Sequence, residues 1–426
     1  MTRIAFFGPL PPLNTGIADY DEAVLPILRK DFEVDVFLER TFPGQEGFSH
    51  ADFFSKHYQN PYDLTLYQMG NSLFHEYMYG YLFQNPGVVI FHDYCLLHSR
   101  SEMLLEKACF QEYREELAAV YPEQAEQIAD TIISSAAGDL LFYQFPFFEL
   151  VLRSSLAAAA HTEVAVKKLS TPQTPVIKIP HLELPGADLT QQDPAPEKFV
   201  IATFGYVTGA KRISTLLEVI AEIGKQHSEV ITVIVGDVED RAALNQQVES
   251  LGLGNRVIVT KRLPITEFLQ WMGRADVIVN LRYPSAGEMS GTLIRSLASA
   301  KPVIISRLPG LQEIPEDAVL RVRPDEEKAD LRKALRSLIT NGELRKKLSA
   351  NARNYILKHH SAELVRTQYR KLIELAMERK AHFQGIDLPV HLQSGKAILR
   401  NSLRRGPLKD APGALKWLAD KKFCAG

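Results

Sequence analysis

Cysteine is scarce in this chain of 426 residues, and charge of neither sign dominates. The three cysteines, Cys95, Cys109 and Cys424, are odd in number and lack metal-ligand spacing, which is typical of a reducing compartment. The formal net charge of −2 gives no general attraction to nucleic acid or to an anionic membrane. No cluster of acidic residues has metal-binding spacing. We therefore expect a protein of the reducing cytoplasm that has no metal site and no nucleic-acid partner.

Long hydrophobic runs are absent as well. The most apolar stretch, residues 140–160, contains Glu149 and Arg153 and is a poor candidate for a transmembrane span. The sequence begins Met-Thr-Arg and continues as an apolar strand, which is not the pattern of a signal peptide. These observations predict a cytoplasmic protein without a membrane-spanning segment.

The composition, 46% hydrophobic and 23% charged, is that of a globular protein, and the length fits two domains. Both halves alternate short apolar runs with amphipathic helices, which predicts an α/β fold of two Rossmann-like, doubly wound domains. The predicted segments are a first domain at 1–185 with a mainly helical insertion at about 99–160, a linker at 186–198, a second domain at 199–360, a final long helix at 361–382 and a basic tail at 383–426.

The stretch at 280–306 carries the strongest chemical signal. A buried strand leads into a loop rich in Pro, Ser and Gly, and a helix begins near Ser290. The amides at a helix N-terminus, here near Gly291 and Thr292, bind anions together with the positive end of the helix dipole. Arg282 adds a permanent charge, and the Glu288 carboxylate can accept hydrogen bonds from sugar hydroxyls. A nucleotide diphosphate that carries a sugar would use all of these features, whereas an ordinary βαβ unit is the plainer alternative.

A second loop, 205–212, follows the predicted strand at 199–205. It begins at Gly205 and ends with Lys211 and Arg212, directly before an amphipathic helix. Cations at a helix N-terminus oppose the helix dipole, and an anion bound between the loop and the helix removes this conflict. The pair therefore predicts a phosphate contact; a solvated basic face is the alternative.

The loop after the first predicted strand excludes one nucleotide-binding class. A nicotinamide-binding Rossmann domain needs a Gly-x-Gly-x-x-Gly turn, but here Gly8 and Gly16 stand eight residues apart with three prolines between them. Such a longer loop suits the lining of a cleft. Gly16 and Asp19 are the candidate residues in it, and a loop made rigid by proline is the alternative.

Polar residues also follow two later strands of the first domain. His92 and Asp93 come directly after the strand at 88–91, and Asn71 and His75 follow the preceding strand. Ligands bind at the carboxyl edge of an open α/β sheet, so we expect these four side chains on the binding rim. A lone histidine is more often structural, and Asp93 could serve only to orient or cap.

Several of these strings resemble glycosyltransferase family 4, whose members are retaining enzymes of the GT-B fold. The resemblance rests on Leu-Arg-Tyr-Pro-x-x-Gly-Glu-x-Ser-Gly from Leu281, Pro-Pro-x-x-x-Gly-Ile-Ala-Asp-Tyr from Pro11, Gly-Asn-x-x-x-His and Phe-His-Asp, and it covers most of residues 1–380. It implies that Lys211 neutralises the donor diphosphate, that His92 lies near the sugar, and that the final helix braces the first domain. Two positions depart from the pattern: Arg295 replaces the second glutamate, which usually contacts the ribose, and Tyr206 replaces an arginine.

The resemblance implies transfer of a hexose-type sugar from a nucleotide diphosphate sugar to a glycan or lipid-linked acceptor, in polysaccharide or cell-envelope glycan synthesis. We find no carboxylate pair suited to classical retaining hydrolysis, which favours a front-face reaction with the leaving phosphate as base. Fixed cations then replace a metal, and no further cofactor is expected. Another GT-B activity, such as an epimerase or phosphorylase, and a non-catalytic sugar-nucleotide-binding subunit remain alternatives. The predicted site residues are His92, Glu288 and Lys211 for catalysis, Gly16, Gly205, Arg212, Arg282, Ser290, Gly291, Thr292 and Arg295 for the donor, and Asp19, Asn71, His75 and Asp93 for the acceptor or cleft.

The tail differs in composition from the rest of the chain. Between residues 396 and 422 it has eight Lys or Arg against two Asp, with leucines and Trp417 between them. A basic amphipathic helix can rest on an anionic membrane surface, here the inner face. We favour a solvated tail, or one packed on the protein, over this membrane contact.

Overall fold

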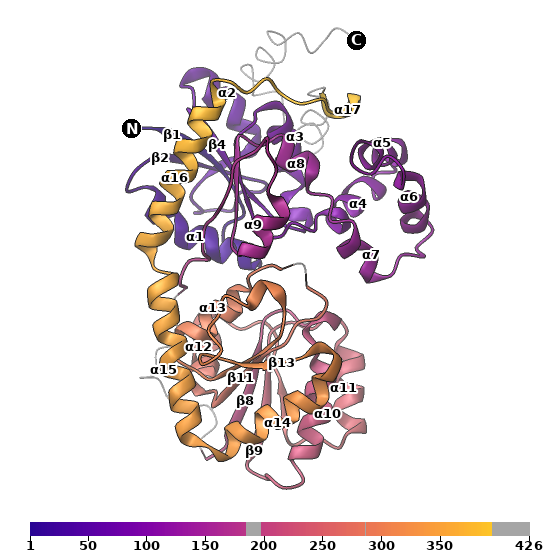
Figure 1. Cartoon of the computed structure of the whole chain (residues 1–426), viewed down its shortest axis with the longest axis vertical. Coiled ribbons are helices and arrows are strands. Elements are labelled where there is room, and N and C mark those ends of the chain that lie inside the picture. Colours follow the sequence, from indigo (N-terminus) through magenta and orange to yellow (C-terminus); the bar gives the residue numbers. More distant parts are fainter. Residues whose placement is uncertain (185–196, 286, 394–426) are drawn as a thin grey trace. The chain divides into compact units, whose positions relative to one another are not determined.

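The structure, a computed structural model, describes residues 1–184, 197–285 and 287–393. The chain divides into two compact units, one of Met1–Pro180 with Glu363 onward and one of His181–Ala362. Each unit is built on one parallel β-sheet with helices packed against it (Figure 1). The predicted α/β fold with two Rossmann-like sheets is confirmed.

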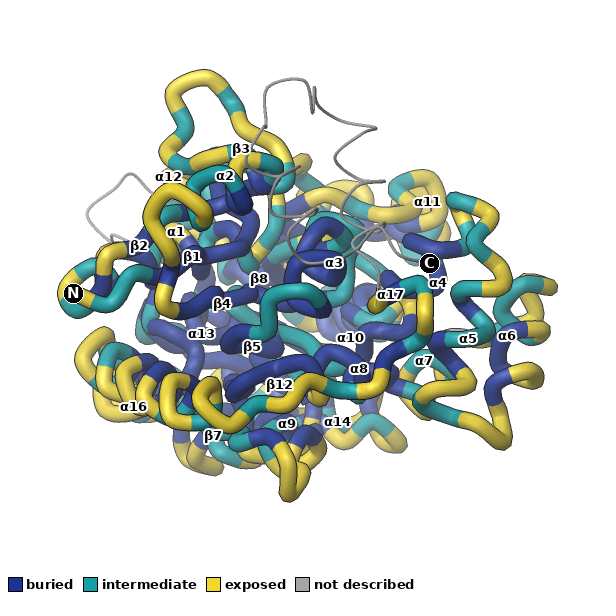
Figure 2. The backbone as a smooth tube through the Cα atoms, turned by 90° about the horizontal axis from the view of Figure 1, so that it is seen from above, coloured by how far each residue is buried: buried dark blue, intermediate teal, exposed yellow. Residues whose placement is uncertain are grey.

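The first unit contains a seven-stranded sheet in the order β3-β2-β1-β4-β5-β6-β7. Most of its strands are continuous apolar runs, as expected for parallel strands that helices cover on both faces (Figure 2). The direction of the strand order reverses between β1 and β4, which makes the carboxyl ends of these strands a topological switch point. The strands are β1 (Arg3–Phe7), β2 (Glu33–Leu38), β3 (Phe48–Ser49), β4 (Leu64–Met69), β5 (Val88–Phe91), β6 (Ala157–Ala160) and β7 (Val176–Lys178).

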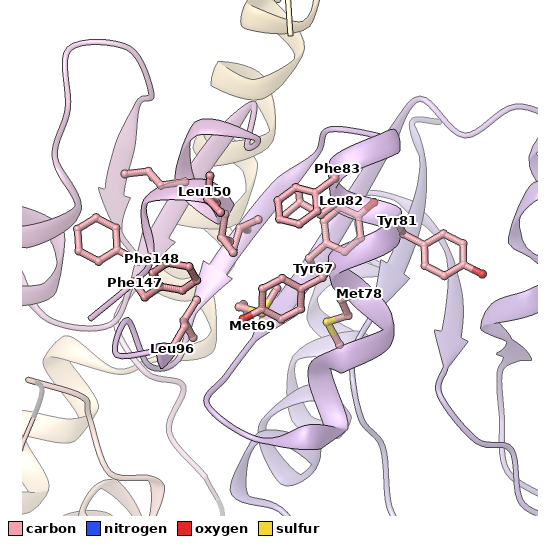
Figure 3. Close-up of a cluster of buried hydrophobic side chains, with 14 of the residues drawn as sticks. Tyr67, Met69, Met78, Tyr81, Leu82, Phe83, Leu96, Phe147, Phe148 and Leu150 are labelled. Carbon is pink, nitrogen blue, oxygen red and sulfur yellow. The ribbon is translucent and has the colours of Figure 1, made fainter. Parts of the chain in front are cut away.

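The helices of the first unit bury a largely aromatic core. In Figure 3 the side chains of β4 and α3 lie beside Leu96, Phe147, Phe148 and Leu150, all buried in the same cluster. The insertion consists of α4 to α8 and ends before β6, which belongs to the sheet. The helices are α1 (Gly16–Leu28), α2 (Phe53–Gln59), α3 (Glu76–Gln84), α4 (Leu97–Leu105), α5 (Phe110–Val120), α6 (Ala125–Ile133), α7 (Asp139–Gln144), α8 (Glu149–Arg153), α9 (Glu163–Leu169), α16 (Ala362–Lys380) and α17 (Val390–Gln393).

Helix α16 packs on the first unit although it follows the second in sequence. The Tyr369 hydroxyl lies 3.1 Å from that of Tyr20 on α1, and both rings are fully buried. Arg366 Nε donates to Asp31 Oδ2 at 2.7 Å. The last long helix of the chain is therefore part of the first unit's packing.

The second unit contains a six-stranded sheet in the order β10-β9-β8-β11-β12-β13. Residues of α12, α13 and α15 pack in one core cluster and residues of α10, α11 and α14 in another, so helices cover both faces. The strands are β8 (Phe199–Phe204), β9 (Val230–Val235), β10 (Val257–Val259), β11 (Val277–Asn280), β12 (Val303–Ser306) and β13 (Leu320–Val322). The helices are α10 (Ile213–Ile223), α11 (Arg241–Ser250), α12 (Ile265–Arg274), α13 (Gly291–Ala298), α14 (Glu327–Thr340) and α15 (Gly342–His359).

Two predicted segments, the basic tail and the linker, lie largely outside the described residues. The basic tail from residue 394 onward lies outside the described residues, as does the predicted linker apart from its last two residues. Within the described parts of the chain, no helix combines the length and the apolar character needed to span a membrane.

Candidate functional site

Several of the predicted donor residues of the second unit lie at its topological switch point. Strands β8 and β11 are neighbours, and the strand order runs outward from them in opposite directions. The loop that begins at Gly205 follows β8, and the loop at 281–290 follows β11. Ligands of open α/β sheets bind where two such loops diverge.

Helix α13 presents its N-terminus at this point. Ser290 is the N-cap, with extended backbone angles, and its Oγ accepts a hydrogen bond from Leu293 N at 3.4 Å. The Ser290 and Thr292 hydroxyls lie 2.8 Å apart, and Asn280 Nδ2 donates to Thr292 Oγ1 at 3.2 Å. The first turn contains no acidic residue that would compete for an anion. The end of β11 thus fixes the start of a helix whose dipole and first amides favour negative charge.

Gly205 allows the β8 loop to approach this helix closely. Its φ of +95° is in a region that other residues rarely adopt. A Cβ at this position would lie 3.3 Å from Thr292 Cγ2 and 3.4 Å from Lys211 Nζ. Gly205, Thr292 and Lys211, which the sequence places up to 87 residues apart, are therefore neighbours in the second unit.

Lys211 is buried, with 8% of its surface exposed, and lies at the end of the 3₁₀ turn η3 (Gly209–Lys211). Its Nζ donates to the Phe204 carbonyl at 2.9 Å. Burial lowers the pKa of Lys211 from the ordinary 10.5 to about 7; the charge of Arg282 acts in the same direction, and that of Glu288 acts against it. A bound anion would favour the charged form of this amine.

Arg282 and Glu288 form an ion pair within the β11 loop. Arg282 Nη1 donates to Glu288 Oε1, and Ser285 Oγ donates to Glu288 Oε2 at 2.8 Å. The loop is packed tightly, because a Cβ on Gly310 would come within 2.8 Å of Gly287 Cα. The carboxylate expected to meet sugar hydroxyls is thus held by a guanidinium and a hydroxyl of its own loop.

The other two predicted arginines are placed differently. Arg212 has a φ of +57° and directs its Nε to both carboxylate oxygens of Glu327 on α14, at 3.0 and 3.1 Å. A phosphate contact would require this guanidinium to leave or share Glu327, which is 115 residues away in the sequence. Arg295 is buried in the last turn of α13, where a cation suits the helix dipole, and not in the first turn with Ser290.

In the first unit, His92 is part of a hydrogen-bond network. Its Nε2 lies 2.7 Å from Gln68 Oε1, and its Nδ1 lies 3.1 Å from His161 Nε2. Gln68 Nε2 in turn donates to the Tyr369 hydroxyl of α16 at 3.4 Å. Sequence reasoning missed His161 as a partner of His92, although the strand β6 ends directly before it at the same edge of the sheet. Both ring nitrogens of His92 therefore contact protein groups.

The remaining predicted residues of this unit support its loops and helices. Asn71 Oδ1 accepts from Ser99 N at 3.0 Å, near the start of α4, and Asp93 Oδ1 accepts from Cys95 N at 2.9 Å. His75 is completely buried, and burial lowers its pKa to about 4. Asn71 and Asp93 thus each accept a backbone hydrogen bond, and the His75 ring is enclosed in the first unit.

Gly16 and Asp19 lie in the first turn of α1. Gly16 is the first residue of the helix, and a Cβ there would meet no atom within 4 Å. Asp19 is an acidic residue in the first turn, where it suits the helix dipole. Within the residues that the structure describes, no group of three or more His, Cys, Asp or Glu side chains is arranged to hold a metal ion.

Comparison with known proteins relates part of the second unit to a family. Residues 188–355 match the family described as Glycosyl transferases group 1. An uncharacterized glycosyltransferase of Methanocaldococcus jannaschii is 21% identical over 200 residues, which are 46% of this chain and 50% of that protein, so the chain spans about half of the relative's length.

Two solved structures share the fold at low sequence identity. Sucrose-phosphate synthase from Thermosynechococcus elongatus is 17% identical with a TM-score of 0.63, over 90% of this chain and 100% of that one. HepE of Anabaena, crystallised in complex with UDP-glucose, is 15% identical with a TM-score of 0.62, over 88% and 100%. The chain therefore shares the two-sheet GT-B fold of these structures, and residues 188–355, within its second unit, match the Glycosyl transferases group 1 family.

Proposed function

We propose that the protein is a hexosyltransferase that uses a nucleotide diphosphate sugar as donor. One observation carries the proposal: Lys211, Arg282 and the N-terminus of α13 meet around Gly205 at the switch point of the second unit. Within the described residues the Lys211 amine makes no hydrogen bond to a carboxylate, and it lies beside a helix N-terminus, which suits a ligand with several negative charges. The complex of HepE with UDP-glucose on a similar fold supports this ligand class.

The charge arrangement suits stabilisation of a leaving diphosphate. Negative charge develops on the phosphate oxygen as the glycosidic bond breaks, and preorganised cations and amides stabilise such charge without reorganisation. Lys211, Arg282 and the first amides of α13 take this role, so we propose a reaction independent of a divalent metal. Ser290 and Thr292 hold the start of α13 in place for it.

We further propose retention of the anomeric configuration. The bond between the anomeric carbon and the phosphate oxygen breaks, and the acceptor oxygen forms its bond on the same face of the sugar. The acceptor proton passes to the departing phosphate oxygen, so no carboxylate nucleophile is required. Glu288 binds sugar hydroxyls, and His92, held by Gln68 and His161, supports the acceptor side in the first unit.

The acceptor class we propose is a glycan or a lipid-linked glycan, made in the cytoplasm for a polysaccharide or for the cell envelope. This part rests on the family resemblance of the motifs and not on a contact in the structure. Contact with the inner face of a membrane through the basic tail belongs to the same proposal.

A second candidate function is a non-catalytic sugar-nucleotide-binding subunit. Two substitutions favour it: Tyr206, which is 58% exposed where related loops carry an arginine, and Arg295, buried where they carry a glutamate. Such a subunit would bind the donor through the same loops without transferring its sugar.

Turnover of a panel of nucleotide sugars tests the proposal. We expect slow hydrolysis of one donor in the presence of EDTA, lost in Lys211→Ala and Glu288→Ala and kept in the exposed control Glu343→Ala. Proton NMR of the freshly released sugar then reports its anomeric configuration, which we expect to equal that of the donor. Tight binding without turnover, across a wide acceptor panel, would support the subunit instead.

A further inference from the structure

The ion pair between Arg282 and Glu288 places a carboxylate on a cation that the donor phosphates would need. Arg282 Nη1 contacts one carboxylate oxygen, and the Ser285 hydroxyl donates to the other at 2.8 Å. Both charged side chains are shielded, with 28% of Arg282 and 14% of Glu288 exposed. The pair is therefore screened less than one on the open surface, so it competes with any anion that approaches Arg282.

We propose that Glu288 competes with the donor phosphates for Arg282. The sugar hydroxyls of a complete donor bind the Glu288 carboxylate and so leave Arg282 to the phosphates. This inference rests on the proposed function of the same loop. In the unliganded protein the carboxylate neutralises Arg282. In the donor complex a phosphate takes over the guanidinium, and Glu288 accepts hydrogen bonds from the sugar.

The hydrogen-bonding capacities of the four groups make this exchange balanced. A guanidinium only donates and a phosphate only accepts, while an ionised carboxylate only accepts and a sugar hydroxyl can donate. A ligand with both phosphate and sugar therefore satisfies Arg282 and Glu288 together. A nucleoside diphosphate without its sugar takes Arg282 but offers Glu288 no replacement donor.

The protein should therefore bind the nucleotide sugar in preference to the free nucleoside diphosphate. The free nucleoside diphosphate has to break the ion pair without compensation at Glu288, so it binds less tightly than its phosphates alone would allow. After transfer, the ion pair re-forms and favours release of the nucleotide product. Glu288 would thus couple recognition of the sugar to retention of the phosphates.

Isothermal titration of the full chain with UDP, UDP-glucose, GDP and GDP-mannose tests this exchange. Glu288→Gln removes the competing charge and keeps the shape of the side chain. At about pH 6, where Lys211 is mainly protonated, we expect the variant to bind the free nucleotide about fivefold more tightly and the matching nucleotide sugar about tenfold more weakly than the wild type. The ratio of the two dissociation constants is the decisive readout.

Two further variants make the result specific. Ser285→Ala removes the hydroxyl that holds the second oxygen of Glu288 and leaves both charges, so we expect it to tighten binding of the free nucleotide by a smaller factor. Glu222→Gln, in an Arg332 ion pair elsewhere in the second unit, is the matched control and should change neither constant. Thermal melting of each variant confirms that it is folded.

The possible failures are distinguishable. If the wild type binds none of the four ligands, the proposed function is wrong and the inference falls with it. If the wild type binds a nucleotide and its sugar conjugate, but Glu288→Gln weakens both by the same factor or changes neither, the donor site stands and the competition is wrong.

Discussion

Replacement of Lys211 by methionine should make the unliganded protein more stable at neutral pH. The amine is buried, its hydrogen bond within the described part of the chain goes to the Phe204 carbonyl, and burial lowers its pKa from 10.5 to about 7. The unfolded chain keeps the ordinary pKa and binds the proton more readily between these two values. Folding therefore either removes the proton from this amine or buries its charge, and both cost free energy. Methionine has a similar length and no charge, so it removes this cost.

The magnitude follows from the shift. At about pH 7 a lysine shifted this far destabilises the folded state by roughly 4 kcal/mol, since each pKa unit corresponds to about 1.4 kcal/mol. Loss of the hydrogen bond to the Phe204 carbonyl offsets about 1 kcal/mol. We expect Lys211→Met to gain about 3 kcal/mol at neutral pH or below.

The destabilisation caused by Lys211 depends on pH. The penalty is complete below the folded pKa of about 7 and fades as pH rises towards 10.5, where the unfolded chain also loses the proton. Urea melts between about pH 6 and pH 9.5 should therefore show the advantage of the variant shrinking with pH. Exposed Lys225→Met is the matched control, with no such trend expected. A variant that is less stable than the wild type at every pH, or an advantage independent of pH, would refute the reasoning.

Three further substitutions test the local structure. Gly205→Ala should lower the free energy of unfolding by about 1–3 kcal/mol and abolish nucleotide-sugar binding, because the φ of +95° is strained for alanine. Gly209→Ala is the control: its Cβ would meet no atom within 4 Å, so binding should be unchanged. Ser290→Ala removes the cap of α13 and should cost about 1 kcal/mol in urea melts while weakening nucleotide binding severalfold. Arg100→Met leaves the buried Glu116 carboxylate without its main cation and should lower the free energy of unfolding by about 3 kcal/mol in the same assay; an unchanged midpoint would contradict the buried ion pair.

The fold was largely predictable because its strands are short apolar runs at regular intervals. The run at 88–91 was visible in the sequence and forms β5, and the strand expected at 199–205 forms β8, Phe199–Phe204. The short edge strands β3 and β13 were missed, since two or three residues give no periodicity. Gly16 and Asp19, expected in a loop, lie in the first turn of helix α1, because Thr15 Oγ1 accepts from Ile17 N and caps the helix.

The local backbone features of the candidate site were more predictable than the partners of its side chains. Local rules favour serine as the cap of a helix and glycine where another segment approaches the backbone closely. Ser290 and Gly205 occupy such positions, and the structure brings them together with Lys211. The pairing of Arg212 with Glu327 was not predictable, because no local pattern connects residues so far apart in the chain. The same holds for Gln68 as a partner of His92, since it depends on the register of two neighbouring strands.

The most direct test of the donor site is a titration of the full chain with a panel of nucleoside diphosphates and their sugar conjugates. We expect at least one nucleotide sugar to bind without added metal, and Lys211→Ala to abolish this binding while Lys225→Ala does not. If no member of the panel binds to the wild type, or if binding is unaffected in Lys211→Ala, the assignment of the loops around Gly205 to a donor diphosphate is contradicted.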